Sequence, residues 1–323
     1  MTKFFTCANR ESLGKRPQTI LKSYMDIQYH STHIPVLCAE MLETLAPSPG
    51  KVYLDGTFGG GGYTRAILKT NVAKVIAFDR DSDAVKRAEP FKEEFGERFE
   101  IVHACFSDIH KHIEPGTVDG IVFDFGISSY QVDEAHRGFS FRQNGPLDMR
   151  MGIGSQYSAA DVVNTFKEKD IADILYLYGE ESRSKKIAKA IVEARSIQPF
   201  ETTQELALLI RKIVPSQEGF DPATLTFQGL RIFVNNELIE IERALQLSNQ
   251  LLPIGGRLVT VAFHALEDRL IKNHSQMDFN HQGYLCSYAK INKKVIVPSQ
   301  EEVRSNPRSR SAKLRGFIKQ VRR

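Results

Sequence analysis

Short apolar runs alternate with amphipathic segments in the first half of the chain, and this pattern predicts a parallel α/β fold. Four runs have the length and composition of buried strands: 51–55, 74–78, 99–103 and 120–123. Helically spaced apolar residues lie between these runs at 63–69 and 82–95. Because strands that alternate with helices form a parallel sheet covered on both faces, we expect a doubly wound α/β sheet.

The pattern changes after the fourth predicted strand. Residues 125–157 are rich in Gly, Ser, Phe and Arg and have no periodicity, which indicates a long functional loop. Five helices are then predicted: 159–167, 170–179, 181–195, 202–215 and 225–252. Ser158 and the pair Thr202 and Glu205 have the spacing of helix caps. Strands are predicted again at 257–263 and 313–321.

This order predicts one sheet domain interrupted by a helical insert. We assign 25–135 and 223–323 to the sheet domain and 136–222 to the insert. Residues 1–24 are basic and rich in hydroxyl side chains, and a second methionine, Met25, follows them. We expect a disordered or dispensable extension there, with an organelle transit peptide as the alternative.

Composition narrows the class of protein without changing this fold. The 323 residues are 41% hydrophobic and 25% charged, and no apolar run reaches the length that spans a bilayer. The four cysteines form no CxxC pair, so we expect buried, inert thiols and no metal site. The net charge of +4 is uneven, because 304–323 holds eight Lys or Arg residues and 25–303 has a net charge of −8.

A glycine cluster after the first strand suggests a ligand site. Gly59 to Gly62 let a ligand approach the backbone closely at the start of the next helix. Thr64 stands where a dinucleotide fingerprint requires its third glycine. Asp79 ends the second strand 20 residues after Gly59 and is suited to bind ribose hydroxyls. NAD and S-adenosylmethionine both carry that ribose, and a helix cap is the structural alternative.

Further candidates follow the third and fourth strands. Phe106 is suited to stack on an adenine, although a phenylalanine is more often part of a core. Asp124 and Gln131 follow the fourth strand, where a carboxylate and an amide can orient an amine or the amino-acid part of a cofactor. A solvated helix cap is the alternative there.

Together these motifs resemble the MraW/RsmH family over about residues 30–323. The matching motifs are His33-x-Pro-Val-Leu37, Asp55-Gly-Thr-Phe-Gly-Gly-Gly-Gly62, Asp79-Arg-Asp81, Asp124-x-Gly-x-Ser-Ser-x-Gln131, Arg137-Gly-Phe-Ser-Phe141, Gly145-Pro-Leu-Asp-Met-Arg150, Tyr178-Gly-Glu-Glu181, Pro222-Ala-Thr-x-Thr-Phe-Gln228, Phe263-His-x-Leu-Glu-Asp-Arg269 and Asn306-Pro-Arg-Ser-Arg-Ser311. The resemblance implies a Rossmann-like S-adenosylmethionine (SAM)-dependent methyltransferase sheet with an inserted helical domain. It also implies methylation of a cytosine N4 in small-subunit ribosomal RNA.

The resemblance assigns the cofactor contacts to seven residues: Gly61, Gly62, Tyr63, Asp79, Phe106, Asp124 and Gln131. This chain departs from the family at Tyr63, where His is usual, at Ala265, where Ser is usual, and at Gly152, where Asp is common. Asp124 is our first candidate for a catalytic hydrogen-bond acceptor and His264 the second, with a structural role for His264 equally open.

RNA contacts are predicted on the long loop and on the basic tail. The candidates are Arg137, Phe139, Phe141, Asp148, Arg150, Arg308 and Arg310. Packing of Phe139 and Phe141 between insert and core is the alternative.

We expect a cytoplasmic bacterial enzyme, or a mitochondrial matrix enzyme if 1–24 is a transit peptide. Its substrate would be rRNA in an assembled or nearly assembled small subunit, and a homodimer is left open. An RNA-binding assembly factor with little turnover and a NAD-dependent dehydrogenase are the competing functions.

Overall fold

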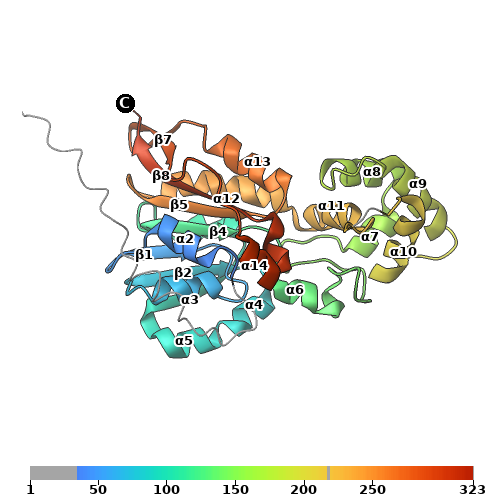
Figure 1. The fold of residues 1–323 in the computed structure, drawn as a ribbon, viewed down its shortest axis with the longest axis horizontal. Helices are drawn as coiled ribbons and strands as arrows, with labels where there is room; N and C mark the ends of the chain where they lie inside the picture. The colour runs from blue at the N-terminus through green and yellow to red at the C-terminus, as the bar shows by residue number, and fades with distance from the viewer. Residues whose placement is uncertain (1–34, 217–218, 323) are drawn as a thin grey trace, which may run out of the picture. The chain divides into compact units, whose positions relative to one another are not determined.

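The computed structural model describes residues 35–216 and 219–322, and a single mixed sheet lies at the centre of this part. The strand order is β3-β2-β1-β4-β5-β8-β7-β6 (Figure 1). Five strands pair in parallel: β1 (Val52–Asp55), β2 (Lys74–Asp79), β3 (Phe99–His103), β4 (Gly120–Asp124) and β5 (Arg257–Ala262). Three pair antiparallel at the other edge: β6 (Phe279–His281), β7 (Tyr284–Lys290) and β8 (Lys313–Val321). The predicted doubly wound α/β sheet is confirmed.

Strand order reverses between β1 and β4, which pair side by side although β2 and β3 intervene in the chain. Ligands bind at such a switch point, beyond the carboxyl ends of the strands. Asp55 ends β1, Asp79 ends β2 and Asp124 ends β4. The topology therefore gathers these three acidic residues along one edge of the sheet, the one formed by the carboxyl ends of its parallel strands.

Several helices pack on the parallel part of the sheet. They are α2 (Cys38–Leu45), α3 (Gly62–Leu68), α4 (Ser82–Arg87), α5 (Glu89–Phe95), α12 (Glu237–Leu251) and α13 (Ala265–His274). In α12, Ile241 and Leu245 are buried in one cluster with Leu54, Ile121 and Leu258 of the strands. Burial of such side chains from water supplies about 1.5–3 kcal/mol each, so this cluster anchors the strands whose ends carry the acidic residues.

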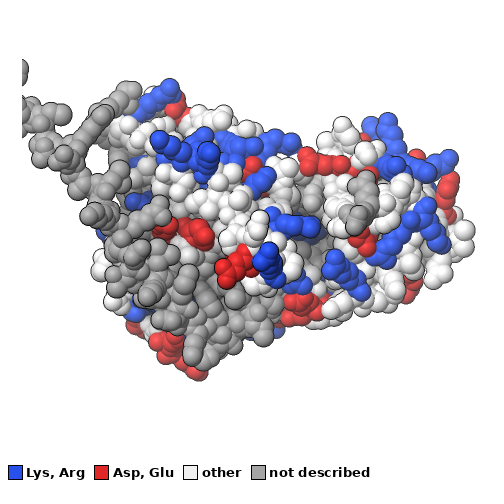
Figure 2. All heavy atoms as spheres, viewed as in Figure 1, with Lys and Arg blue, Asp and Glu red and all other residues white. Residues whose placement is uncertain are grey.

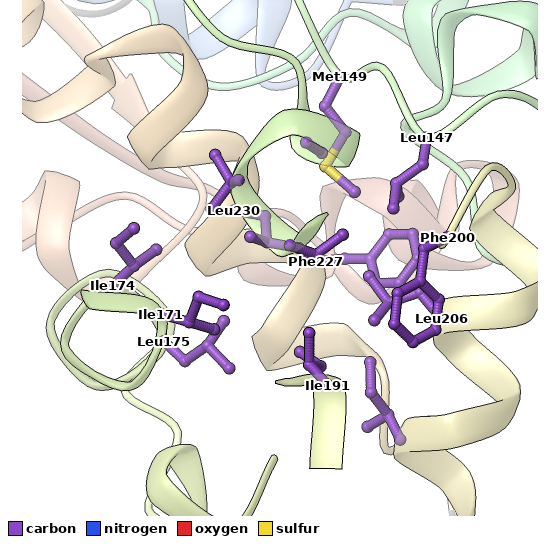
Figure 3. Close-up of a cluster of buried hydrophobic side chains, with 14 of the residues drawn as sticks. Leu147, Met149, Ile171, Ile174, Leu175, Ile191, Phe200, Leu206, Phe227 and Leu230 are labelled. Carbon is purple, nitrogen blue, oxygen red and sulfur yellow. The ribbon is translucent and has the colours of Figure 1, made fainter. Parts of the chain in front are cut away.

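A second cluster of buried side chains holds together the helices between β4 and β5 (Figure 3). These helices are α7 (Ala159–Thr165), α8 (Glu168–Leu177), α9 (Ser184–Arg195), α10 (Thr203–Ile213) and α11 (Thr224–Asn235). Phe227 and Leu230 of α11 belong to this cluster, although our predicted boundary assigns α11 to the sheet domain. We therefore propose that the helical insert extends to Asn235.

The predicted caps of the insert helices are present. Ser158 accepts from the N–H of Asp161, and Thr202 accepts from the N–H of Glu205, so both form capping boxes. The helix predicted to open at Asp170 begins at Glu168, and the one predicted from 181 begins at Ser184.

Three predicted segments differ from the structure. The helix predicted at 82–95 is two helices, since Pro90 occupies the first turn of α5 and separates it from α4. The helix predicted at 225–252 breaks at Asn236, whose φ of 53° is left-handed. The loop predicted at 125–157 contains the short helix α6 (Ser129–Asp133).

Some elements were not predicted at all. Strands β6 and β7, helix α13 and helix α14 (Gln300–Ser305) lie in segments for which we made no assignment. Residues 1–24 and Met25 lie outside the described residues. In the described part of the chain, no helix is both long and apolar enough to span a bilayer.

Candidate functional site

The glycine loop between β1 and α3 is tightly packed by aromatic and proline side chains. Gly61 caps α3 with a φ of 75°, a conformation that favours glycine. A Cβ atom on Gly61 would lie 2.3 Å from the Phe91 ring, and one on Gly62 would lie 2.8 Å from Pro35. A Cβ on Gly60 would lie 2.8 Å from Tyr130. Glycine is therefore required here by the packing of this loop.

Asp79 is joined directly to the glycine loop. Its carboxylate accepts hydrogen bonds from the N–H of Gly59 at 2.7 Å and from the N–H of Asp81 at 2.9 Å. Burial nevertheless raises the pKa of Asp79 to about 6. Two backbone donors leave acceptor capacity on both carboxylate oxygens, so Asp79 remains able to accept from the hydroxyls of a ribose. The capping role belongs to Asp81, which accepts from the N–H of Asp83.

Tyr63 does not extend into an open site. It is buried, and its hydroxyl donates to the carbonyl of Val36. This bond holds the segment that precedes α2 against the glycine loop, where Pro35 also packs. Tyr63 thus contributes to the shape of the loop through its anchoring of this segment.

Asp124 carries the clearest unsatisfied group of the site. Its backbone N–H donates to the Thr57 hydroxyl at 2.7 Å, but its Oδ1 atom is buried and has no hydrogen-bond partner. Burial raises the pKa of Asp124 well above its ordinary value, and the nearby carboxylates of Asp55 and Glu267 raise it further. An unpaired buried oxygen at a strand end is the feature expected of a ligand contact.

Phe106 lies shortly after β3, at the carboxyl ends of the parallel strands. Its ring is half-buried, with centroids 5.9 Å from Phe123 and 6.0 Å from Phe125, the two neighbours of Asp124 in the chain. The ring is therefore fixed by aromatic packing while part of it stays exposed.

His264 contacts Glu267 through both ring nitrogens. Its Nδ1 accepts from the N–H of Glu267 at 3.4 Å, and its Nε2 lies 3.1 Å from Glu267 Oε1. His264 is thus the N-cap of α13, which supports the structural alternative for this residue. Glu267 is completely buried and its other oxygen accepts from the N–H of Phe263 at 2.7 Å.

Glu237, His264 and Glu267 have ligand atoms within 4.8 Å of one another, close enough to share a metal ion. Arg231, however, donates to both carboxylate oxygens of Glu237, at 2.7 and 2.9 Å. We interpret this group as an ion-pair network, because the guanidinium already neutralises the carboxylate that a cation would need.

Both polar atoms of the Gln131 amide are hydrogen-bonded within the protein. Its Oε1 accepts from the N–H of Ser128 at 3.0 Å, and its Nε2 donates to Asp81 Oδ2 at 2.9 Å. Arg137 donates to the same oxygen at 2.8 Å. Both residues therefore support the turn after Asp79 in this structure.

The aromatic residues of the long loop are packed inward. Phe139 is buried in the helical cluster, and Phe141 packs edge-on against Phe227 with ring centroids 5.2 Å apart. Both rings thus pack within the helical cluster of the insert, whereas the predicted alternative places them between insert and core. A base-stacking role stays a prediction. Asp148 pairs with the half-exposed Arg150 through both carboxylate oxygens, at 2.8 and 2.6 Å.

Basic side chains gather on the face shown in Figure 2, over β7, β8 and α13 and again over the insert helices. Arg308 in the C-terminal segment is half-exposed and donates to both oxygens of Asp133 in α6, at 3.1 and 2.5 Å. Arg310 is exposed. The two tail arginines thus differ in how far a local carboxylate neutralises them.

Several residues of this site were missed by sequence reasoning. Thr57 lies inside the quoted glycine motif, but nothing in its type or position indicates a bond to Asp124. Arg80 belongs to the quoted Asp79-Arg-Asp motif, so a sequence signal for it was present. Arg231 and Glu237 lie on different helices, and their pairing depends on the break at Asn236.

Known proteins resemble this chain along most of its length. Ribosomal RNA small subunit methyltransferase H of Paramagnetospirillum magneticum is 48% identical over 300 residues, covering 88% of this chain and 94% of that protein. The protein of the same name in Rickettsia akari is 46% identical, covering 88% and 97%. A solved structure, a putative rRNA methylase from Clostridium thermocellum, has a TM-score of 0.44 and 11% identity, covering 90% of this chain and all of that one.

The family comparison agrees with the order of the motifs along the chain. The model that describes the MraW methylase family matches residues 30–320. This match includes the glycine loop, Asp79, Asp124, the helical insert and the basic C-terminal segment. The chain therefore belongs to the MraW methylase family.

Proposed function

We propose that this chain transfers a methyl group from SAM to N4 of a cytosine in small-subunit ribosomal RNA. The observation that carries the proposal is the unpaired, buried Oδ1 of Asp124 at the sheet's switch point. The relatives named above as small-subunit rRNA methyltransferases support rRNA as the substrate class. The resemblance described above supports cytosine N4 as the target atom.

The residues at this edge fit SAM. Asp79 retains acceptor capacity for ribose hydroxyls, Phe106 offers a partly exposed ring to an adenine, and Asp124 lies at the next strand end. The backbone at Gly60 is exposed and that at Gly62 is half-buried, so a ligand at the same edge can approach both. Since the cofactor bears positive charge on its sulfonium and ammonium groups, an edge that collects Asp79 and Asp124 matches it electrostatically.

SAM supplies an electrophilic methyl group, and the protein's task is then to position the amine and remove its proton. The N4 lone pair of cytosine is delocalised into the ring, so an acceptor for one of its N–H bonds raises its nucleophilicity. Asp124 is our proposed acceptor, because its free oxygen lies in a buried environment that strengthens a hydrogen bond. His264 is the weaker candidate, since its Nδ1 caps α13 and its Nε2, although without a hydrogen-bond partner, lies 3.1 Å from Glu267 Oε1.

The target base must leave its stack to reach a buried carboxylate. We propose that Arg150, Arg308 and Arg310 contribute phosphate contacts, because each is exposed. Arg137, Phe139 and Asp148 act in our proposal by shaping the loop that faces the RNA, and Phe141 joins that loop to α11.

Deletion of the gene tests the reaction directly. Mass spectrometry of small-subunit rRNA from the deletion strain should show loss of one N4-methylcytidine, restored by the wild-type chain. If the Asp124→Asn variant restored N4-methylcytidine to the wild-type level, a catalytic role for Asp124 would be excluded. Unchanged N4-methylcytidine in the deletion strain would refute the proposed function.

Further measurements test the physical form of the substrate and the identity of the cofactor. Methylation of isolated small subunits, with little activity on protein-free rRNA, would support an assembled subunit as the substrate. Equilibrium binding with SAM and NAD separates the methyltransferase from a dehydrogenase. A homodimer and a cytoplasmic location remain predictions, which analytical ultracentrifugation and cell fractionation would test.

A further inference from the structure

Arg80 directly follows Asp79 and is a buried cation. The residue is 8% exposed, and among the described residues its guanidinium forms no ion pair with a carboxylate. Its guanidinium donates instead to two backbone carbonyls. Nε and Nη2 bond the carbonyl of Ile153 at 3.1 and 2.6 Å, and Nη1 bonds that of Asn235 at 2.9 Å.

One of these two carbonyls comes from the long loop that we propose to face RNA, and the other from the end of a helix of the insert. Ile153 lies in the long loop, and Asn235 is the last residue of α11. The carbonyl end of a helix carries partial negative charge, which partly compensates the buried guanidinium. Burying a charge with only carbonyl partners is costly, so this arrangement depends on the loop and α11 being in place.

Asn235 binds the same loop with its side chain, which is completely buried. Its Nδ2 donates to the carbonyl of Met149 at 2.7 Å, and its Oδ1 accepts from the N–H of Met151 at 2.8 Å and from Ser155 Oγ at 2.9 Å. Arg80 and Asn235 therefore hold residues 149–155, which we call the anchored loop, at four positions.

The backbones of Arg80 and the anchored loop are also in direct contact. The N–H of Ile153 donates to the carbonyl of Arg80 at 3.3 Å. A Cβ on Gly152 would lie 2.2 Å from that carbonyl oxygen, so the Asp that is common in the family at this position would not fit this backbone. On the other side, Arg137 joins Asp81 to the carbonyl of Arg150, at 2.8 and 3.1 Å.

From this geometry we infer that Arg80 is a positioning residue that couples SAM binding to RNA binding. The inference rests on the proposed function, in which Asp79 holds the ribose. A ligand on Asp79 restrains the turn at 79–81, and Arg80 transmits that restraint to the anchored loop and to α11. A loop that is already ordered loses less entropy when RNA binds, so each ligand raises the affinity for the other.

The test measures this coupling with a matched pair of variants. Arg98 also donates from a half-buried guanidinium to two carbonyls, those of Val72 at 3.2 Å and Leu68 at 2.6 Å, but has no bond to the anchored loop. Arg80→Met and Arg98→Met therefore each remove a guanidinium that donates to two backbone carbonyls, and only the first of these contacts the anchored loop. The probe is the small ribosomal subunit isolated from the deletion strain, with its affinity measured without and with saturating S-adenosylhomocysteine, which cannot be turned over.

We expect S-adenosylhomocysteine to tighten subunit binding by about five- to tenfold in the wild type and in Arg98→Met. In Arg80→Met the effect should fall below about twofold, while SAM affinity in the absence of RNA changes less than about threefold. Arg80→Lys, which keeps the charge and some donors, should retain an intermediate coupling and serves if Arg80→Met does not fold. Hydrogen exchange at the amides of Met151 and Ile153 should accelerate in the Arg80 variants alone.

Wild-type coupling in both Arg80 variants, or no coupling in the wild type, would overturn the inference. Either result leaves the proposed function standing as long as the wild type still methylates the isolated subunits. Failure of the wild type to bind SAM or to methylate subunits would refute the proposed function instead.

Discussion

The backbone N–H of Asp124 donates to the hydroxyl of Thr57 at 2.7 Å, and this bond joins the carboxyl ends of β4 and β1. Thr57 in turn donates its own N–H to Asp55 Oδ1 at 3.1 Å. The position of the unpaired Asp124 carboxyl is therefore set by a residue of the glycine loop. A substitution of Thr57 should therefore alter SAM affinity although no acidic group is removed.

Thr57→Val should weaken SAM binding by about tenfold, since an unpaired buried N–H costs about 1–3 kcal/mol and Asp124 is free to shift. Thr57→Ser keeps the hydroxyl and is the matched control. Isothermal titration calorimetry with both variants measures the effect. Equal SAM affinity in the valine and serine variants would show that this bond does not position Asp124.

SAM binding should release a proton from Asp124. Burial and two nearby carboxylates raise the pKa of this group, so the free protein holds it protonated at a pH where an ordinary aspartate is ionised. A cation bound beside it favours the ionised form and lowers its pKa. Calorimetry in phosphate and in Tris, whose ionisation enthalpies differ, at several pH values between 5 and 8 follows the proton release.

Asp124→Asn is the control for this proton count. The variant has no proton to lose at this position, so its binding enthalpy should depend less on the buffer than that of the wild type. Asp79 contributes little at pH 7.5, because its pKa is about 6. A wild-type enthalpy independent of buffer would contradict the prediction.

SAM affinity should fall as the pH drops through about 6, where Asp79 becomes protonated. A protonated carboxyl loses acceptor strength toward ribose hydroxyls and toward the N–H of Gly59. Fluorescence titrations with SAM between pH 5 and 8 would follow this loss. Asp79→Asn should bind more weakly at pH 8 and show a flatter pH profile; a profile as steep as that of the wild type would assign the titration to another group.

His274 should make the fold sensitive to acid. It is buried, and burial lowers its pKa to about 4 from an ordinary value of about 6.5. The unfolded chain therefore binds the proton more readily, and stability present above pH 6.5 is lost progressively as the pH falls toward 4, by at most about 3 kcal/mol. Urea unfolding at pH 7 and pH 5 measures the difference.

His274→Phe removes the titrating group and fills a similar volume beside Tyr288, whose ring centroid lies 5.7 Å from that of His274. The free energy of unfolding should then change less between the two pH values. The exposed His136 provides the control, since His136→Gln should keep the wild-type pH trend. An unchanged trend in His274→Phe would locate the acid sensitivity elsewhere.

The strand-end acids could be predicted from sequence because each stands at the boundary of an apolar run. Asp79 and Asp124 end β2 and β4 as expected, and the sheet topology then brings them to one edge. Burial could not be predicted in the same way. The loop sequence around Phe139 predicts an exposed aromatic side chain. Phe139 is buried instead, because α7–α11 form a core from residues that are distant in sequence.

The break at Asn236 shows a similar limit. Apolar spacing continues across it, and only the left-handed backbone of Asn236 separates α11 from α12. That break directs Arg231 back toward Glu237 and presents the carbonyl of Asn235 to Arg80. Periodicity reports the face of a helix and carries no signal for a break at a single residue.

Arg310 should contribute more to RNA affinity than Arg308. Arg308 is paired with Asp133 through both carboxylate oxygens, so part of its charge is neutralised before RNA binds. Arg310→Ala should therefore weaken binding to isolated subunits more than Arg308→Ala, and each change should reduce the salt dependence by about one counterion. Fluorescence anisotropy at several salt concentrations measures both quantities.

Asp133→Asn provides the sharper comparison, because it frees Arg308 without removing a cation. If the tail contacts phosphates, this variant should bind subunits more tightly than the wild type at low salt, and the gain should disappear at high salt. In the double variant Asp133→Asn with Arg308→Ala, the gain should vanish as well. A gain that persists in the double variant would mean that Asp133 itself repels RNA and that Arg308 is only its structural partner.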